Sequence, residues 1–304
     1  MKRNVIMNHL GRVLVSSVGV LAIAGVAVAD DTTSGYSGLE SMDTDKVEQK
    51  FIVNPGYTYE AEADFDHSSA GDVSVSRFDI PARYTLKLEQ GEIGLGAFYE
   101  YSCYEFSDLT SDQQFNTLSF NAYWKSMIDD TWGYFVFGGL GLSASTDADL
   151  GNGVTGMGGA GARYIYSTNL NFGLGAGIAS QLEDDPIFLP VILVNWQIDE
   201  RWALQVFNGA TISYDVTGEK RIIVDAGANY KRRQYALDHD GAAIDRQINL
   251  EVGATYRFSP KIGVRGFVGV AAARNFELRQ DDHKLGDEDV DSTPYFGVRA
   301  LFTF

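Results

Sequence analysis

The chain has 304 residues, with 24 Lys and Arg against 41 Asp and Glu, and its formal net charge at pH 7 is −17. Nucleic acid is excluded as a partner, because phosphate contacts need a basic surface. The chain has one cysteine, Cys103, which excludes an intrachain disulfide.

Residues 1–29 have the pattern of a secretory signal peptide. Lys2 and Arg3 precede an apolar stretch over residues 13–28, and small residues precede the expected cleavage site before Asp30. An uncleaved membrane anchor is the alternative, but the apolar stretch is shorter than the ~20 residues that a spanning helix needs. Removing the three basic residues of this segment leaves a mature net charge of −20.

The mature chain divides into a tail and one domain. Residues 30–48 are polar, acidic and without sustained periodicity, which predicts a flexible periplasmic tail. From residue 49 to 304 alternating strands are joined in turn by short and longer connections. This pattern of strands and connections predicts an all-β fold, namely a closed antiparallel transmembrane β-barrel. In such a barrel half of the residues of each spanning strand face lipid and half face a polar interior, which gives the alternating sequence. A soluble β-sandwich is the alternative explanation of the same alternation.

Two kinds of connection alternate along this domain. Short turns carry turn-forming residues at 89–92, 129–131, 167–169, 199–201, 217–220 and 259–261. Longer, Asp-rich links are expected near 66–72, 107–113, 145–153, 183–187, 238–246 and 281–292. The asymmetry is typical of outer-membrane barrels, in which the short turns are periplasmic and the long loops extracellular.

The strand count depends on the stretch from Trp202 to Val216. It holds two short strands only if Asn208 and Gly209 close a tight hairpin, and this dipeptide is the strongest short-range signal of a two-residue turn. Accepting the hairpin gives about 14 strands, an even number as is the rule for single-chain bacterial barrels. The alternative is 12 strands.

Apolar residues at every second position mark the lipid-facing side of most strands. Two such rows are Leu118, Phe120, Ala122 and Trp124, and Ile248, Leu250, Val252, Ala254, Tyr256 and Phe258. Aromatic residues beside the short turns belong at the membrane interface. Cys103 falls on the lipid-facing side, where it is expected to act as a small apolar residue.

The same alternation sends charged residues inward. The candidates for lining the lumen are Glu60, Glu62, Arg77, Arg83, Lys87, Glu251, Arg257, Arg265 and Arg299, with Asp64, Asp79, Asp225, Lys231 and Arg233 on the same walls. Charges of both signs on neighbouring strands predict cross-strand ion pairs. The middle strands place glycines inward instead, which predicts a bare wall. Two interpretations stay open: a narrow aqueous passage between the two walls, or charged side chains that cross and plug the lumen.

Residues for catalysis are scarce. His67, His239 and His283 each lie beside an aspartate in an expected loop, and no histidine lies on an expected strand of the barrel. A hydrolase at the rim, using His239 and Asp240, is the less favoured alternative. The Asp-rich loops lack the full ligand spacing of a calcium loop, and the glycine-rich runs lack a following helix. We therefore expect no enzyme activity, no catalytic residue, no metal site and no cofactor.

The last strand, from Tyr295 to Phe304, alternates apolar and polar residues and ends on an aromatic residue. It resembles the carboxy-terminal signal of bacterial outer-membrane β-barrels, and the resemblance implies that Phe302 and Phe304 are read by the barrel-insertion machinery. The layout of 189–196, 199–204 and 230–232 is similar to an uncharacterised outer-membrane barrel family, catalogued as a domain of unknown function. The resemblance covers roughly residues 50–304, implies a barrel and brings no activity with it.

These features predict an integral protein of the Gram-negative outer membrane, exported through a cleaved signal, that acts as a monomeric, passive, narrow porin for small solutes. The alternative is a closed structural barrel that serves envelope integrity or surface contact. The expected partners are outer-membrane lipid and lipopolysaccharide, the insertion machinery and small solutes. The acidic loops share divalent cations with lipopolysaccharide, or form only a soluble, self-repelling layer.

Overall fold

The computed structural model of the protein describes residues 48–66, 71–107, 112–207, 209–238, 241–280 and 283–304. The predicted signal peptide, and the predicted tail up to residue 47, lie outside the described residues. In the described ranges the single helix is η1 (Leu150–Gly153), and no helix there is long and apolar enough to cross a membrane.

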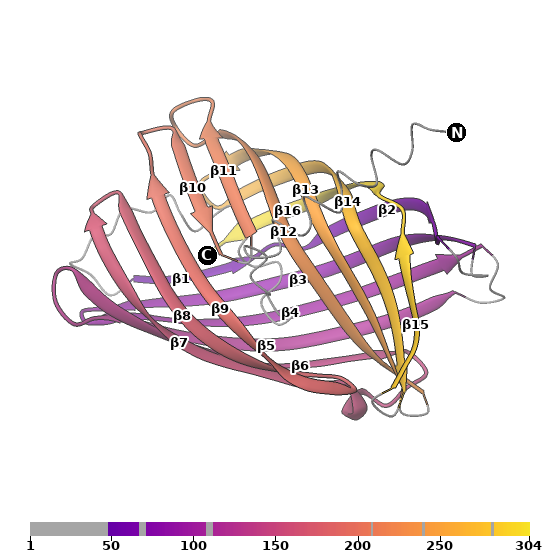
Figure 1. The fold of residues 1–304 in the computed structure, drawn as a ribbon. Helices are drawn as coiled ribbons and strands as arrows, with labels where there is room; N and C mark the ends of the chain where they lie inside the picture. Colours follow the sequence, from indigo (N-terminus) through magenta and orange to yellow (C-terminus); the bar gives the residue numbers. More distant parts are fainter. Residues whose placement is uncertain (1–47, 67–70, 108–111, 208, 239–240, 281–282) are drawn as a thin grey trace, which may run out of the picture.

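The rest of the fold is one antiparallel sheet, whose strands run side by side around the molecule in Figure 1. The strands are β1 (Glu48–Val53), β2 (Gly56–Asp64), β3 (Asp72–Leu88), β4 (Gly91–Phe106), β5 (Gln113–Met127), β6 (Trp132–Ser145), β7 (Val154–Ser167), β8 (Leu170–Gln181), β9 (Asp184–Gln197), β10 (Trp202–Val206), β11 (Gly209–Asp215), β12 (Ile222–Leu237), β13 (Gly241–Ser259), β14 (Ile262–Gln280), β15 (His283–Val290) and β16 (Thr293–Thr303).

The sheet closes into a barrel of 14 strands. β1 and β2 share one position in the wall, because both pair with β3, along its residues 82–87 and 72–79. β15 and β16 share another position, because both pair with β14. The barrel closes where β16 pairs with β2, with Tyr295 opposite Glu60. The predicted closed antiparallel transmembrane β-barrel is confirmed.

The strand count follows from the β10–β11 hairpin. The two strands pair through Val206 and Ala210, and Gly209 has φ +147°, a backbone conformation that favours glycine. Asn208 lies outside the described residues. The prediction of 14 strands is confirmed, and the alternative of 12 is wrong.

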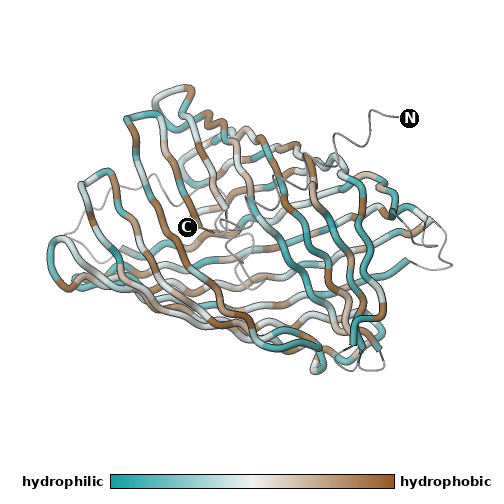
Figure 2. Tube along the Cα trace, in the orientation of Figure 1, coloured by the Kyte–Doolittle hydropathy of each residue, from teal (hydrophilic) through white to brown (hydrophobic). Residues whose placement is uncertain are grey.

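The outer surface carries the predicted apolar rows. Leu140, Leu174, Val252 and Val268 are among its most exposed apolar side chains. Figure 2 shows hydrophobic and hydrophilic residues alternating along the strands, as one apolar face and one polar face require. Cys103 lies on the outward side of β4, because its neighbours Ser102 and Tyr104 reach Tyr235 across the interior.

Two short turns share one sequence pattern and one structure. Residues 128–132 and 198–202 both read Ile-Asp-x-x-Trp. In each turn the Oδ1 atom of the aspartate, Asp129 or Asp199, accepts hydrogen bonds from the backbone N–H groups two and three residues later, over 2.7 to 2.8 Å. These bonds favour the ionised carboxylate and hold the pKa of both side chains below its usual value.

A lowered carboxyl pKa predicts a stability that depends on pH. We expect the variant with Asp129→Asn and Asp199→Asn to unfold at a lower temperature than the wild-type protein at pH 7. The difference should shrink as the pH falls from about 3.9, the ordinary aspartate pKa of the unfolded chain, through the lowered pKa of the two carboxyl groups in the folded protein, because both states are then protonated. Tryptophan fluorescence during heating measures it.

The matched control replaces Asp130 by Asn and Glu200 by Gln, which removes the same charge from the same two turns. This control should unfold like the wild-type protein at pH 7. An equal loss of stability at pH 7 and pH 2 in the test variant would show that the hydrogen bonds do not depend on the carboxylate charge.

The end of the barrel opposite the short turns has shorter loops than predicted. β9 begins at Asp184 and β13 at Gly241, inside two expected loops, and β15 (His283–Val290) occupies most of a third. Their polar composition suggested loops, but polar residues also suit strands that continue beyond a membrane. The extensions carry the barrel wall past the apolar rows.

At this end the wall also folds inward. The short β10–β11 hairpin reaches only to Asn229 of β12 and to Val194 of β9. Beyond the hairpin, Ala236 of β12 pairs in parallel with Ala144 of β6. β12 therefore crosses towards β6, and the strands converge at the lower right of Figure 1. This end of the barrel is narrower than the end with the short turns.

Candidate functional site: the closed lumen

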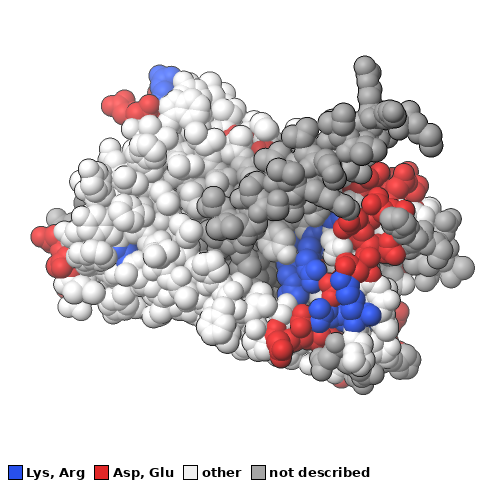
Figure 3. Space-filling view, in the orientation of Figure 1, with Lys and Arg blue, Asp and Glu red and all other residues white. Residues whose placement is uncertain are grey.

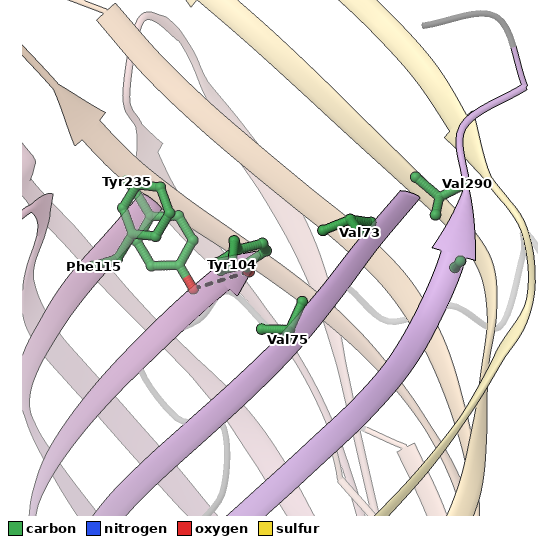
Figure 4. Packing of buried hydrophobic residues seen from close by; sticks show 7 residues of the cluster. Val73, Val75, Tyr104, Phe115, Tyr235 and Val290 are labelled. Carbon is green, nitrogen blue, oxygen red and sulfur yellow. Dashed lines mark hydrogen bonds between the residues drawn. The ribbon is translucent and has the colours of Figure 1, made fainter. Parts of the chain in front are cut away.

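A cluster of aromatic and aliphatic side chains closes the narrow half of the lumen. We name Tyr104, Phe115 and Tyr235 the aromatic plug; each is at most 2% exposed. The rings of Phe115 and Tyr235 stack with their centres 4.2 Å apart, and Tyr104 meets Phe115 edge-on at 5.3 Å. Figure 4 shows the plug rings beside Val73 and Val75. Because β4 and β5 lie across the barrel from β12, these contacts join opposite walls.

Next to the plug lies a layer of six buried charges. Three arginines and three acids form this charged layer, so that its formal charge is zero: Arg77, Arg233, Arg274, Glu60, Glu100 and Asp245. Three arginines opposite three carboxylates allow each buried charge a partner, which burial requires.

Asp245 is the centre of the charged layer. Its carboxylate accepts two hydrogen bonds from Arg274, at 3.1 Å each, and one from Arg77 at 3.3 Å. The Tyr104 hydroxyl donates a further bond to Asp245 at 2.8 Å, which links the layer to the plug. Two walls of the barrel are joined through this one residue, since Arg77 and Tyr104 come from β3 and β4 and Asp245 from β13.

The other contacts of the charged layer involve Glu60, Arg233 and Glu100. Arg77 also pairs with Glu60, and Arg274 Nη1 lies 3.6 Å from Glu60 Oε2. On the other side, Arg233 Nε of β12 donates to Glu100 Oε1 of β4 over 3.2 Å. At this height charged side chains cross the lumen, which is the arrangement expected of a plugged interior.

A second polar group lies nearer the short turns. Arg265 Nη2 is 2.5 Å from both Asp225 Oδ2 and Glu251 Oε1. Arg299 Nη2 is 3.0 Å from Asp79 Oδ2. Arg265 and Arg299 are cross-strand neighbours of like charge, and each has its own carboxylate partner.

A cavity of about 30 Å³ lies between the two polar groups, with room for about two or three water molecules. Its lining includes Glu60, Arg77, Asp79, Glu100, Asn229, Lys231, Arg233, Asn249, Glu251, Arg265 and Arg299. Several polar atoms of the lining residues are buried and have no hydrogen-bond partner among the described residues, among them Arg233 Nη1, Asn229 Oδ1 and Asn249 Oδ1. Such atoms are suited to binding water or a small polar solute.

The opposite side of the lumen is not the bare glycine wall that was predicted. The ring of Phe135 covers Gly161 and the ring of Phe137 covers Gly159; an added Cβ there would lie 2.3 and 2.4 Å from the two rings. The glycines therefore make room for phenylalanine rings, and the lumen beside Gly159 and Gly161 is apolar. The prediction overlooked that Phe135 and Phe137 occupy inward positions of β6.

The structure brings five of the nine predicted lining residues together around the cavity: Glu60, Arg77, Glu251, Arg265 and Arg299. Three others, Arg83, Lys87 and Arg257, share the inward register but lie nearer the short turns, outside the cavity lining. Three of the other predicted inward charges, Asp79, Lys231 and Arg233, also line the cavity. Asp225 is not part of the lining, but it forms an ion pair with Arg265, which is.

The predicted inward position of Glu62 is wrong. A register shift between Glu60 and Ala63 places an extra residue in β2, so Ala63 takes the inward position and both Glu62 and Asp64 are exposed. A β-bulge of this kind reverses the alternation beyond it.

Sequence reasoning missed the plug and half of the charged layer. Arg274 faces inward because Ala273, with φ +49°, shifts the register of β14. Tyr104 and Tyr235 follow the simple alternation, but no pattern along one strand indicates that two strands meet across a lumen. What the sequence offered for each of them was a tyrosine at an inward strand position close to a predicted loop.

The other predicted residues have no described role in the lumen. His67, His239 and Asp240 lie outside the described residues, and His283 is exposed on β15. At the carboxy-terminus the ring of Phe304 lies 6.0 Å from that of Phe51, which belongs to the first strand of the wall. The role of Phe302 and Phe304 in insertion stays a prediction.

Among the described residues, one group of metal-binding atom types lies on the outer side of the barrel. Cys103, Glu105 and Asp112 bring one ligand atom each to within 4.8 Å of the others. Both carboxylates are exposed. The group lies away from the lumen and takes no part in the charged layer.

The fold and the lumen define a class of protein, a transmembrane β-barrel of 14 strands whose interior is crossed by buried charges and closed by aromatic rings. Residues 93–287 match the model of a protein family described as domain of unknown function DUF6268, and the chain belongs to this family. The suspected resemblance to an uncharacterised outer-membrane barrel family is confirmed.

No curated protein matches the chain. Among solved structures, a deltaS2 mutant of the monoaromatic hydrocarbon channel TodX is 10% identical, with coverage of 84% of this chain and 90% of that chain and a TM-score of 0.47. The COG4313 outer membrane channel from Pseudomonas putida F1 is 11% identical, with 87% and 99% coverage and a TM-score of 0.46. The KdgM porin is 11% identical, with 83% and 99% coverage and a TM-score of 0.36. These structural neighbours are channels and porins.

Proposed function

We propose that the protein is an outer-membrane channel for small polar solutes, closed in the conformation described here and opened by separation of the aromatic plug. In this proposal a cleaved signal exports the chain, and the barrel is an integral protein of the outer membrane. A closed barrel with an apolar exterior is one of the two architectures that satisfy every backbone hydrogen bond within a bilayer.

The observation that carries the proposal is the cavity in the polar interior. A barrel that served only as a structural element could fill its lumen with apolar side chains, because buried ion pairs add little net stability. Here nine charged side chains line a cavity with room for about two or three water molecules. Polar atoms on the lining, among them Arg233 Nη1, have no hydrogen-bond partner among the described residues. Rings of charged side chains of this kind are typical of the constriction of a channel.

The proposed path runs from the end with the short turns towards the plug. Arg83, Lys87 and Arg257 would line its entrance, and the cavity between the charged layer and the group of Arg265 and Arg299 would form the constriction. On this path the charged layer selects the solute and the plug sets the open probability.

Recording of single channels in planar bilayers tests the proposal. We expect rare and small conductance steps from the wild-type protein. Replacing Arg265 or Arg299 with alanine should change the size of the step, because both guanidinium groups border the cavity. The control is Arg221→Ala, which removes the same charge from an exposed turn where Arg221 hydrogen-bonds Tyr256; its step should equal that of the wild-type protein.

A closed structural barrel is the second candidate, and the contacts between opposite walls favour it. Ala144 of β6 pairs with Ala236 of β12, and the backbone N–H of Leu182 donates to the side-chain Oε1 of Gln234 over 2.9 Å. This candidate predicts silent membranes from the wild-type protein and from every lumen variant that folds.

A further inference from the structure

Four basic side chains gather on the outward face of β12, β14 and their neighbours, at the narrow end of the barrel. We name Arg232, Arg246, Arg279 and Lys284 the outer basic cluster. Arg232 and Arg246 point outward because Arg233 and Asp245, the residues next to them in the chain, point into the lumen. Figure 3 shows basic and acidic side chains gathered at the lower right of the molecule, beside a mostly uncharged visible surface.

Two members of the cluster are direct cross-strand partners of like charge. Arg232 lies opposite Arg246 in the pairing of β12 with β13. Like charges in this position repel each other. Arg246 is compensated, because its Nη2 atom lies 2.8 Å from Glu277 Oε2.

Arg232 has no such compensation. Its side chain is only 5% exposed, and its Nη1 and Nη2 atoms have no hydrogen-bond partner among the described residues. The nearest acids are engaged elsewhere, since Arg279 pairs with both Asp184, at 2.9 Å, and Glu277. A guanidinium that is shielded from water normally has an acceptor. The position between Arg232 and Arg246 is therefore suited to an anion, and Arg246, which is 28% exposed, connects it to the outside.

The cluster begins where the lipid-facing row of β13 ends. That row runs from Phe258 to Ile248, and the next outward residue is Arg246. Ten residues of strand span about 34 Å, which is a height of about 26 Å at the usual tilt and matches the ~25 Å apolar belt of such barrels. Arg232 follows the outward Tyr230 on β12 in the same way. The outer basic cluster thus lies at the level of lipid headgroups.

We propose that Arg232 and Arg246 bind a phosphate group on a lipid of the outer leaflet. Guanidinium groups bind phosphate through paired hydrogen bonds, which are stronger than bonds between neutral groups. One phosphate between the two arginines would satisfy Arg232 and remove the repulsion. Acyl chains of the same lipid would lie along Ile248, Leu250 and Val252 directly beneath. This assignment rests on the membrane location of the barrel and does not depend on whether the lumen conducts.

Native mass spectrometry of the purified, folded barrel in detergent tests the site. The probes are lipid A with two phosphates, the same lipid without phosphate, and inorganic phosphate. We expect the wild-type protein to hold the phosphorylated lipid, and Arg232→Gln to weaken this binding at least about tenfold, the effect of losing one charge-assisted hydrogen bond. Arg232→Lys, which keeps the charge, should lose less.

Three results would overturn the assignment. They are equal binding of phosphorylated and unphosphorylated lipid by the wild-type protein, unchanged binding by Arg232→Gln, and displacement of the lipid by millimolar inorganic phosphate. The control is Arg221→Gln, which removes an arginine from the opposite end of the barrel; it should bind the lipid as the wild-type protein does. Heat-modifiable migration on a gel checks that each variant is folded.

Discussion

The variant with Phe115→Ala and Tyr235→Ala is expected to open frequently in planar bilayers, with larger steps than the wild-type protein. The two rings stack 4.2 Å apart between opposite walls and fill the narrow half of the lumen. Their removal leaves a gap there, bounded by the charged layer. Each aromatic truncation also costs about 3 to 5 kcal/mol in a buried core, so a gel must first show that the variant is folded.

Tyr235→Phe is the control for the plug. It keeps the ring and removes the hydroxyl, which lies 3.3 Å from the Ser102 hydroxyl and 3.4 Å from that of Tyr104. We expect its conductance to stay as rare as that of the wild-type protein. A folded double variant that leaves the membrane silent would rule out the plug as a gate and would favour the closed structural barrel.

The outer half of this fold is predictable from the sequence, because contact with lipid imposes one rule on every strand. Residues that touch hydrocarbon must be apolar, so the rows from Leu118 and from Ile248 identify the outward side without any knowledge of neighbouring strands. The Asn208–Gly209 signal then decided between 14 and 12 strands. Local rules therefore predict the lipid-facing side of most strands and the strand number.

The lumen-facing side of the strands is less predictable, because a single extra residue in a strand reverses the alternation of inward and outward side chains beyond it. The bulge after Glu60 turns Glu62 outward, and the positive φ of Ala273 turns Arg274 inward. Neither shift has a marker such as glycine in the sequence. A rule that alternates strictly along β2 and β14 must therefore fail beyond these two points.

The contacts that close the lumen depend on distance across the barrel, which no strand encodes alone. Tyr104 and Tyr235 are 131 positions apart in the chain, and they meet where β12 crosses towards β6 beyond the short β10–β11 hairpin. The sequence left open whether the lumen is plugged. In the structure, the contacts of Tyr235 with Phe115 and Tyr104 across the barrel close it.

The charged layer makes a further prediction with a large effect: Asp245→Ala is expected to destabilise the barrel by about 3 to 5 kcal/mol, the usual cost of leaving a buried charge without its partner. Asp245 is 0% exposed and accepts hydrogen bonds from Arg77, Arg274 and Tyr104. Without it the layer has three arginines against two acids. Urea unfolding in lipid vesicles, followed by tryptophan fluorescence, measures the loss.

A double-mutant cycle separates the charge pair from the loss of packing. The second change is Arg274→Gln, which is expected to be destabilising alone because Asp245 and Glu60 then lose a shared partner. The first change in this cycle is Asp245→Asn, measured alone as well. The variant with Asp245→Asn and Arg274→Gln has equal numbers of positive and negative charges in the layer, so it should be more stable than the sum of the two single losses implies. Strict additivity would mean that Asp245 and Arg274 act independently, and that the layer is a set of separate contacts and not one network crossing the lumen.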